Sequence, residues 1–207
     1  MNSPLVPLGR PRAERADAAR NRAHLLTTAR EMMAELGVEK VTMDGLAERA
    51  GLGKGTVYRR FGTRAGIFHA LLDDDEHVFQ EQVLSGPPPL GPGAEPIARL
   101  IAYGRARTAY LADHLAIVRA SLDRNKPVPA GAGATLTRMH LRLLLRLARP
   151  DATDIDVDAL ALQLTAALEG PFMLYLSAPR PEEFAGTPVA DRLGDSWQTL
   201  VESVCRT

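Results

Sequence analysis

The sequence has few of the features that mark secreted, disulfide-stabilised or membrane-spanning proteins. It contains one cysteine, Cys205, so no disulfide can form within the chain, and this suits a reducing compartment. Its apolar runs, such as Leu143–Leu145, are far too short to cross a bilayer. The segment Met1–Pro11 is rich in proline and has no apolar stretch of the kind found in a secretory signal. We therefore expect a cytoplasmic protein that does not associate with membranes.

Net charge is also lacking, because 25 Lys and Arg balance 25 Asp and Glu. That balance would argue against a nucleic-acid partner, but the charges are unevenly distributed. Residues 1–66 hold 12 basic and 7 acidic side chains, and residues 49–64 hold five basic ones and no acidic one. Such a local excess can mark a DNA-binding surface, although a charged stretch by itself is more often a solvated face.

Periodicity and helix breakers predict an all-α fold of about nine helices. No stretch has the sustained alternation of a strand, and there is no internal repeat. The predicted helices span residues 17–36, 42–50, 54–61, 63–84, 96–111, 113–124, 134–149, 156–177 and 188–205. We expect three parts: a flexible basic arm over residues 1–16, a small three-helix head over residues 17–63, and a larger helical body over residues 64–207.

The second and third predicted helices have the pattern of a helix-turn-helix. Thr42 is a good N-cap for the first of them, and Gly51-Leu52-Gly53 separates it from the second. Opposite its apolar side, the second helix presents Lys54, Thr56, Tyr58, Arg59 and Arg60. Basic side chains release counterions from DNA, hydroxyl groups fix the register on phosphates, and the bare backbone of Gly55 lets its N–H approach a phosphate closely. The simpler alternative is a helical hairpin whose charges face water.

The segment 41–64 closely resembles the DNA-binding domain of the TetR (tetracycline-repressor-like) family. The resemblance is ungapped over about residues 20–68, and it rests on Gly51-x-Gly53-Lys54-Gly55-Thr56-x-Tyr58-x-x-Phe61 at this distance behind Thr42. It implies that Thr42 and Tyr58 meet phosphates, that Lys54-Gly55-Thr56 meets bases and adjacent phosphates, and that Arg64 is aimed at the DNA backbone. The candidate DNA contacts are Thr42, Lys54, Gly55, Thr56, Tyr58, Arg59, Arg60 and Arg64.

Three positions depart from the family pattern. Gly53 replaces the usual Ser N-cap, Arg60 replaces a common His, and Ala65 replaces a common Glu. A Ser-to-Gly change at an N-cap costs only a few tenths of a kcal/mol. We expect DNA binding to tolerate these departures, but they leave the base preference open.

The helices predicted at 156–177 and 188–205 are candidates for a dimer interface. The first is apolar nearly all round, so we expect one side to face its own core and the other a partner. The resemblance implies that both helices pair with their symmetry mates in a four-helix bundle. The predicted interface residues are Leu160, Leu164, Leu168, Phe172, Leu193, Trp197 and Leu200. The alternative is that both helices only fill the core of one chain.

A ligand pocket is predicted in the body as a region only. Its candidate residues combine apolar bodies with polar tips, and they are Tyr103, Tyr110, His114, Arg119, His140 and Tyr175. Each alone is more often an ordinary core or surface residue. Asp73 and His77 lie four residues apart on a predicted helix, but without a second cluster at ligand spacing we expect a solvated acidic face, no metal and no cofactor.

These observations predict a ligand-responsive transcriptional regulator and not an enzyme. The resemblance implies a repressor that binds palindromic double-stranded DNA as a homodimer and is released by a small-molecule inducer. One alternative is a helix-turn-helix DNA binder without an effector, whose body would lack an internal cavity. The other is a small helical enzyme with a docking head, which would need convergent acid–base groups that are not visible in the sequence.

Overall fold

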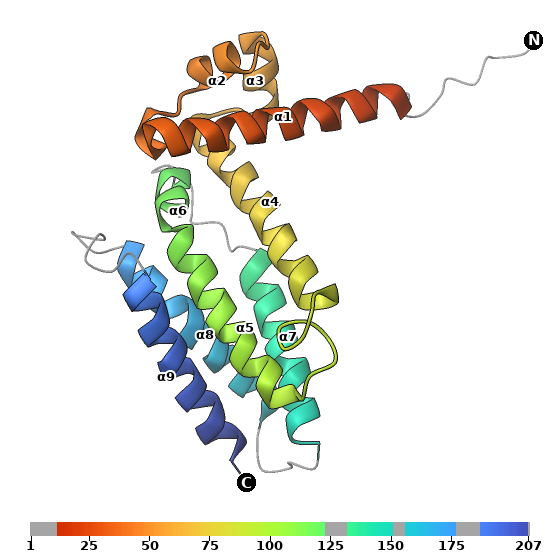
Figure 1. The fold of residues 1–207 in the computed structure, drawn as a ribbon, viewed down its shortest axis with the longest axis vertical. Coiled ribbons are helices and arrows are strands. Elements are labelled where there is room, and N and C mark those ends of the chain that lie inside the picture. Colours follow the sequence, from red (N-terminus) through yellow and green to blue (C-terminus); the bar gives the residue numbers. More distant parts are fainter. Residues whose placement is uncertain (1–11, 123–131, 151–155, 177–186, 207) are drawn as a thin grey trace, which may run out of the picture. The chain divides into compact units, whose positions relative to one another are not determined.

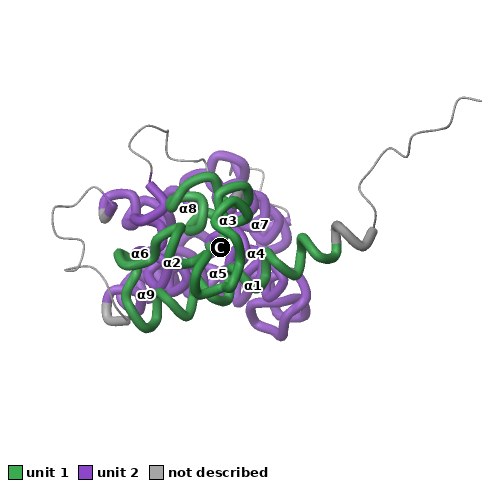
Figure 2. Tube along the Cα trace, turned by 90° about the horizontal axis from the view of Figure 1, so that it is seen from above, with its two compact units in different colours: residues 1–71 green, residues 72–207 purple. Residues whose placement is uncertain are grey.

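The structure is a computed structural model that describes residues 12–122, 132–150, 156–176 and 187–206. Within these ranges the chain forms nine α-helices, α1–α9, and one short 3-10 helix, η1, with no strand, as predicted (Figure 1). The chain divides into two compact units, which meet in sequence at Leu71 and Leu72 (Figure 2). We call the first unit the head and the second the body.

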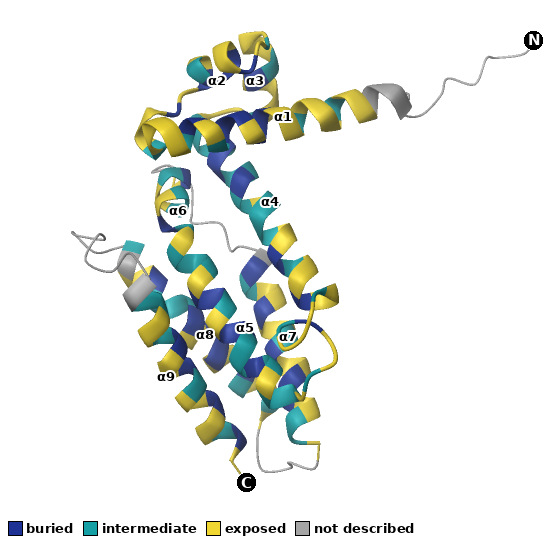
Figure 3. Ribbon diagram, viewed as in Figure 1, coloured by how far each residue is buried: buried dark blue, intermediate teal, exposed yellow. Residues whose placement is uncertain are grey.

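The head is built from α1 (Arg12–Leu36), η1 (Val38–Lys40), α2 (Met43–Arg49), α3 (Lys54–Phe61) and the first residues of α4. One side of α1 is buried through Leu25, Leu26, Ala29 and Met32 (Figure 3). Because α1 begins at Arg12, residues 12–16 are helical and are not part of a flexible arm as predicted. Residues 1–11 of the predicted arm lie outside the described residues. Gly37 follows α1 with a φ of 84°, which favours glycine there.

Local signals set the ends of the two short helices. The Thr42 hydroxyl oxygen accepts a hydrogen bond from the backbone N–H of Gly45 at 3.0 Å, which confirms the predicted N-cap of α2. Gly51 has a φ of 64° in the turn, and Gly62 has a φ of 72° after α3. The bounds of α3, Lys54–Phe61, agree with the prediction.

A single long helix, α4 (Arg64–Ser85), belongs to both units. The hydroxyl oxygen of Thr63 accepts a hydrogen bond from the N–H of Gly66 at 3.2 Å, as expected of a cap. The boundary between head and body was predicted at residues 63 and 64, but the compact units divide within α4, after Leu71. The two units therefore share a helix and are not joined by a loop.

The body continues with α5 (Pro96–Asp113), α6 (Leu115–Ser121), α7 (Ala132–Ala148), α8 (Val157–Leu176) and α9 (Thr187–Cys205). Its core includes Leu100, Tyr103, Leu144 and Val201. Helices α5 and α9 approach closely at Gly104, where an added Cβ would stand 2.0 Å from Nε1 of Trp197. The Trp197 indole N–H donates a hydrogen bond to the Leu100 carbonyl oxygen at 2.8 Å. A glycine is therefore required at position 104 for these two helices to pack as they do.

The structure revises the predicted dimer face of α8 and α9. Four of the predicted interface residues are buried in the chain's own core, namely Leu164, Leu168, Phe172 and Trp197. Leu160 and Leu193 are half-buried against the same core, and only Leu200 is exposed. The apolar residues exposed on α8 include Leu162 and Met173, which belong to the second apolar line of this helix. An apolar helix has two similar faces in sequence, and packing against α5 and α7 decided which face of α8 points inward.

Candidate functional site: the recognition surface and the body cavity

The outer face of α3 is polar, basic and accessible. Val57 anchors the helix in the core of the head with 0% of its surface exposed, whereas Lys54, Tyr58, Arg59 and Arg60 are exposed. Thr56 is half-buried. The helical period produces this separation of a buried and an exposed face. Val57 points into the core, and the residues on the opposite face of α3 point to solvent. The structure thus gives α3 the exposed basic face that the sequence predicted.

Two of these cations are already held by the head itself. The Lys54 ammonium nitrogen lies 2.7 Å from an Asp44 carboxylate oxygen, and both side chains are well exposed. The hydrogen bond from Lys54 to Asp44 raises the pKa of Lys54. The Arg60 guanidinium donates a hydrogen bond to the carbonyl oxygen of Ala18 on α1 at 2.6 Å. A polyanion that binds this face must therefore exchange the Lys54–Asp44 pair for its own contact.

Gly55 is exposed at the start of α3, and nothing inside the described chain requires a glycine there. A Cβ added at Gly55 would meet no heavy atom within 4 Å, and its φ lies outside the left-handed region. Glycine within a helix costs about 0.5–1 kcal/mol relative to alanine. The missing side chain therefore opens space outside the head rather than space within its core.

Arg64 has a structural role that the sequence did not predict. Its guanidinium donates hydrogen bonds to the carbonyl oxygens of Val41 and Val38, both at 2.7 Å. It also lies 4.9 Å from the centre of the Phe68 ring. These contacts tie the start of α4 to the segment around η1. A contact from Arg64 to a DNA phosphate stays a prediction.

An apolar cavity of about 350 Å³ lies in the body between α4, α5 and α7, and we call it the α4–α7 cavity. It is lined by Glu76, Phe79, Gln80, Val83, Leu84, Tyr103, Leu136, Met139, His140 and Leu143. Two of the predicted pocket residues, Tyr103 and His140, lie here with their ring centres 4.8 Å apart. Burial raises the pKa of Tyr103 to about 12 and lowers the pKa of His140 to about 4, the latter also because of the Arg99 charge. Both rings are therefore neutral near pH 7.

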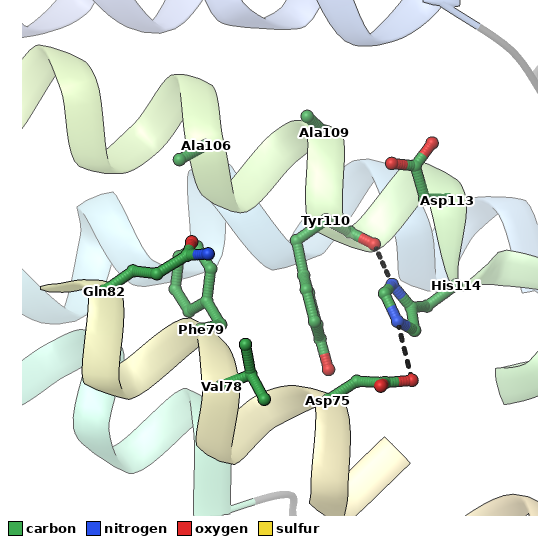
Figure 4. Close-up of a pocket in the computed structure, with 9 residues that line it drawn as sticks. All are labelled: Asp75, Val78, Phe79, Gln82, Ala106, Ala109, Tyr110, Asp113 and His114. Carbon is green, nitrogen blue, oxygen red and sulfur yellow. Dashed lines mark hydrogen bonds and ion pairs between the residues drawn. The ribbon is translucent and has the colours of Figure 1, made fainter. Parts of the chain in front are cut away.

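A second, more open groove of about 380 Å³ lies between α4 and α5 (Figure 4). It contains the predicted residues Tyr110 and His114, whose rings stack 4.1 Å apart. Nδ1 of His114 lies 2.7 Å from the Tyr110 carbonyl oxygen, and Nε2 lies 3.1 Å from a carboxylate oxygen of Asp75 (Figure 4). Arg119 is exposed on α6 and lines neither site. The side chain of Tyr175 lies outside the described residues. The six predicted residues therefore do not form one pocket.

The body also contains a buried ion triad that the sequence analysis missed. Arg107 on α5 is 4% exposed, and its guanidinium lies 2.6 Å from a Glu76 carboxylate oxygen and 3.1 Å from one of Glu169. The guanidinium also lies 5.7 Å from the ring centre of Phe79 and 5.2 Å from that of Tyr110. A buried charge is rare unless it is paired, and Arg107 stands one turn after Tyr103 on the inward side of α5. The inward position of Arg107 on α5 could have indicated a buried charge. Its partners on α4 and α8 are too distant in sequence for the pairing to be predicted.

His77, weighed above as a metal ligand, and the single cysteine, Cys205, have ordinary surroundings. His77 lies 3.5 Å from Glu81 on the same exposed face, and the described residues contain no group of three side chains suited to a metal ion. Cys205 is buried in the body, and burial raises the pKa of its thiol.

Comparison with known proteins identifies the head. Residues 25–71 match the family described as bacterial regulatory proteins, tetR family. An HTH-type transcriptional regulator of Staphylococcus aureus is 32% identical over 65 residues, a match that spans 31% of this chain and 35% of the relative. The chain therefore aligns with only about a third of the length of such relatives.

Solved structures share the fold of most of the chain. A TetR/AcrR-family regulator from Thermobifida fusca has a TM-score of 0.60 at 19% identity, covering 88% of this chain and 96% of that one. A TetR-family regulator from Pectobacterium atrosepticum has a TM-score of 0.60 at 20% identity, covering 95% and 96%. The SmeT–triclosan complex has a TM-score of 0.57 at 19% identity, covering 89% and 91%.

The family match and the exposed basic face of α3 identify the head as a helix-turn-helix DNA-binding domain. Residues 25–71 match the tetR family of bacterial regulatory proteins, and most of the chain shares its fold with solved regulators of that kind.

Proposed function

We propose that the protein is a ligand-responsive repressor that binds a palindromic operator as a homodimer and releases it when a small molecule enters the body. The observation that carries this proposal is α4. This one continuous helix begins in the head beside the recognition helix, and its later residues line the α4–α7 cavity. A DNA binder without an effector would need no such cavity.

The proposed DNA contacts divide into two kinds. Lys54 and Thr56 at the leading end of α3 read bases, while Thr42, Tyr58, Arg59 and Arg60 contact phosphates. Gly55 is where a phosphate comes closest to the backbone, because an added side chain there would occupy only the space outside the head. Phosphate contacts supply affinity without sequence information, and base contacts supply specificity.

Dimerisation is supported by the exposed apolar surface of α8. The segment Val157–Leu174 has a mean hydropathy of 1.2, yet only 28% of it is buried within the chain. A helix of this composition satisfies the length and hydropathy of a membrane span, but the inward face of α8 packs in the core of the body. Large exposed apolar patches mark interaction sites. We propose that Leu162, Met173 and the exposed Leu200 of α9 contact a second copy, so that the operator is an inverted repeat.

Induction follows if the ligand changes the position of α4. Two heads of a dimer must enter major grooves about 34–36 Å apart, so a small change in their separation weakens binding. The ligand can shift this equilibrium only by its differential affinity for the two arrangements. A coupling of about 1–3 kcal/mol corresponds to a change in DNA affinity of about 5–150-fold.

The DNA-binding part is tested by sequencing the genomic fragments that the purified protein captures. We expect an inverted repeat, and we expect the double variant Lys54→Ala, Thr56→Ala to lose that preference. Arg59→Ala is the matched control, because removal of a phosphate contact should weaken all sequences alike and reduce the salt slope by about one. Selection of the same operator by the double variant would contradict the assignment of α3 as the reading helix.

The ligand-responsive part is tested by filling the cavity. Leu143 lines the α4–α7 cavity and is 52% exposed, so Leu143→Trp can occupy the cavity without burying a new group in the core. With an inducer found by screening, calorimetry should show weaker ligand binding when operator is saturating, and no binding to Leu143→Trp. Equal ligand affinity with and without operator would rule out coupling.

A further inference from the structure

The ion triad leaves the wall of the α4–α7 cavity with excess negative charge. Arg107 carries one positive charge, and it pairs with two carboxylates, those of Glu76 and Glu169. The side chains of both glutamates are mostly buried, with 17% and 25% of their surface exposed. The triad therefore has a formal charge of −1 in surroundings where water screens it poorly.

Only one member of the triad lines the cavity, and it is an acid. Glu76 is the single charged residue among the side chains that line the α4–α7 cavity. His140, on the same wall, is neutral at pH 7 because its pKa is about 4. The other carboxylate oxygen of Glu76 accepts a hydrogen bond from the neutral Gln80 amide at 3.1 Å. This neutral contact would compete only weakly with a bound cation for Glu76. The positive charge of Arg99 acts on His140, but Arg99 is not among the residues that line the cavity, and none of the lining residues is a cation at pH 7.

The surroundings of Arg107 show how this part of the body stabilises a cation. The Arg107 guanidinium lies between carboxylates and against the faces of Phe79 and Tyr110. Phe79 also lines the cavity, together with Tyr103. Aromatic faces and carboxylates together favour organic cations, whereas a carboxylate ligand would meet repulsion. Most of the remaining wall is apolar and suits an apolar chain or ring.

We infer that the α4–α7 cavity binds a lipophilic monocation, such as an amine or quaternary ammonium with an apolar tail, whose positive group pairs with Glu76. This inference rests on the proposed function, because it names the chemical class of the effector. The bound cation competes with Arg107 for the carboxylate of Glu76. Ligand binding thus weakens a contact that holds α4 to α5, which links occupancy of the cavity to the helix that continues into the head.

The test compares three ligands with the same apolar chain and different head groups. Decyltrimethylammonium, 1-decanol and decanoate, each below its micelle concentration, are titrated into the full-length protein by calorimetry. We expect the cation to bind at least about tenfold more tightly than decanoate, with decanol between them. In Glu76→Gln this preference should disappear. Glu81→Gln is the matched control, because it removes the same charge from an exposed site on α4 outside the cavity and should keep the preference.

Each other result overturns the inference. Equal binding of the three ligands, or tighter binding of decanoate, refutes the cationic class but leaves a ligand cavity in place if Leu143→Trp abolishes binding. Absence of binding by all three ligands refutes the inference, and the proposed function is then judged by the separate inducer screen. If Glu76→Gln does not fold, Glu169→Gln neutralises the triad without changing the cavity wall. An undiminished preference for the cation in Glu169→Gln would equally refute the inference, because the triad would then have lost its excess negative charge.

Discussion

The head and the body place their functional groups in opposite environments. The head exposes Lys54, Tyr58 and Arg59 on a short helix, and the apolar residues beneath that helix only hold it in place. The body instead buries Arg107 and half-buries its partners around a cavity. An exposed site can be rebuilt by surface substitutions at little cost in stability, whereas a buried ion triad is bound to the packing around it. Ligand recognition and fold stability are therefore separable in the head and coupled in the body.

Two glycines illustrate the same contrast. Gly104 is surrounded by the chain itself, since an added Cβ would overlap the Trp197 indole. Gly55 has open space where its Cβ would be. The first glycine serves internal packing, and the second serves a partner outside the chain.

The largest expected effect comes from placing a charge on the buried face of α8. Leu164→Glu should destabilise the body by more than about 4 kcal/mol, because the side chain is 3% exposed and the carboxylate would have no partner. Fluorescence of Trp197, the single tryptophan of the chain, reports unfolding of the body. Leu162→Glu on the exposed face should leave that signal unchanged but produce monomers in sedimentation. A dimeric Leu162→Glu protein would place the interface elsewhere.

Gly104→Ala should have the next largest effect. The added methyl group forces α5 and α9 apart, and overpacking of this kind costs about 1–3 kcal/mol. Urea unfolding followed by Trp197 fluorescence measures the loss. Because the change lies in the body, the affinity for non-specific DNA should keep the salt dependence of the wild type. Unaltered stability would mean that α9 can shift without cost.

A smaller effect is expected from acid acting on His140. Below pH 6.5 the unfolded chain takes up a proton at this residue, but the folded chain does not until about pH 4. Acid therefore favours unfolding in this window, and the body should lose about 2 kcal/mol of stability between pH 6.5 and pH 4 on account of this residue. His140→Phe should lack this part of the loss. If the free energy of unfolding depended on pH in the same way in the wild type and in His140→Phe, this assignment would be wrong.

The smallest effect on stability, but a clear one on DNA binding, is expected for Gly55→Ala. The head should be unchanged or stabilised by up to about 1 kcal/mol, because alanine favours the helix. Its affinity for DNA should nevertheless fall about tenfold, since a methyl group separates the backbone N–H from a phosphate. Thermal unfolding and DNA titration of the same protein sample measure the two effects. Undiminished DNA affinity would show that no phosphate approaches this position.

Much of the fold was predictable because its signals are local. The Thr42 cap, the turn at Gly51 and the bounds of α3 depend on groups only a few residues apart, and they agree with the structure. The start of α1 was less predictable, because the prolines and arginines before Asp17 resemble an arm. The residues proposed to meet DNA follow from the family motif and from the exposed face of α3.

Local sequence signals specify the helices, the recognition motif and the presence of two apolar lines on α8. Tertiary packing settles that Leu164 faces inward while Leu162 faces outward, because both faces of α8 are apolar and the choice depends on α5 and α7. It also decided that Arg107 meets Glu76 and Glu169, and that Tyr103 and Tyr110 line different cavities. Helix ends are set by hydrogen bonds within a turn or two, whereas burial and charge pairing join residues that only packing brings together.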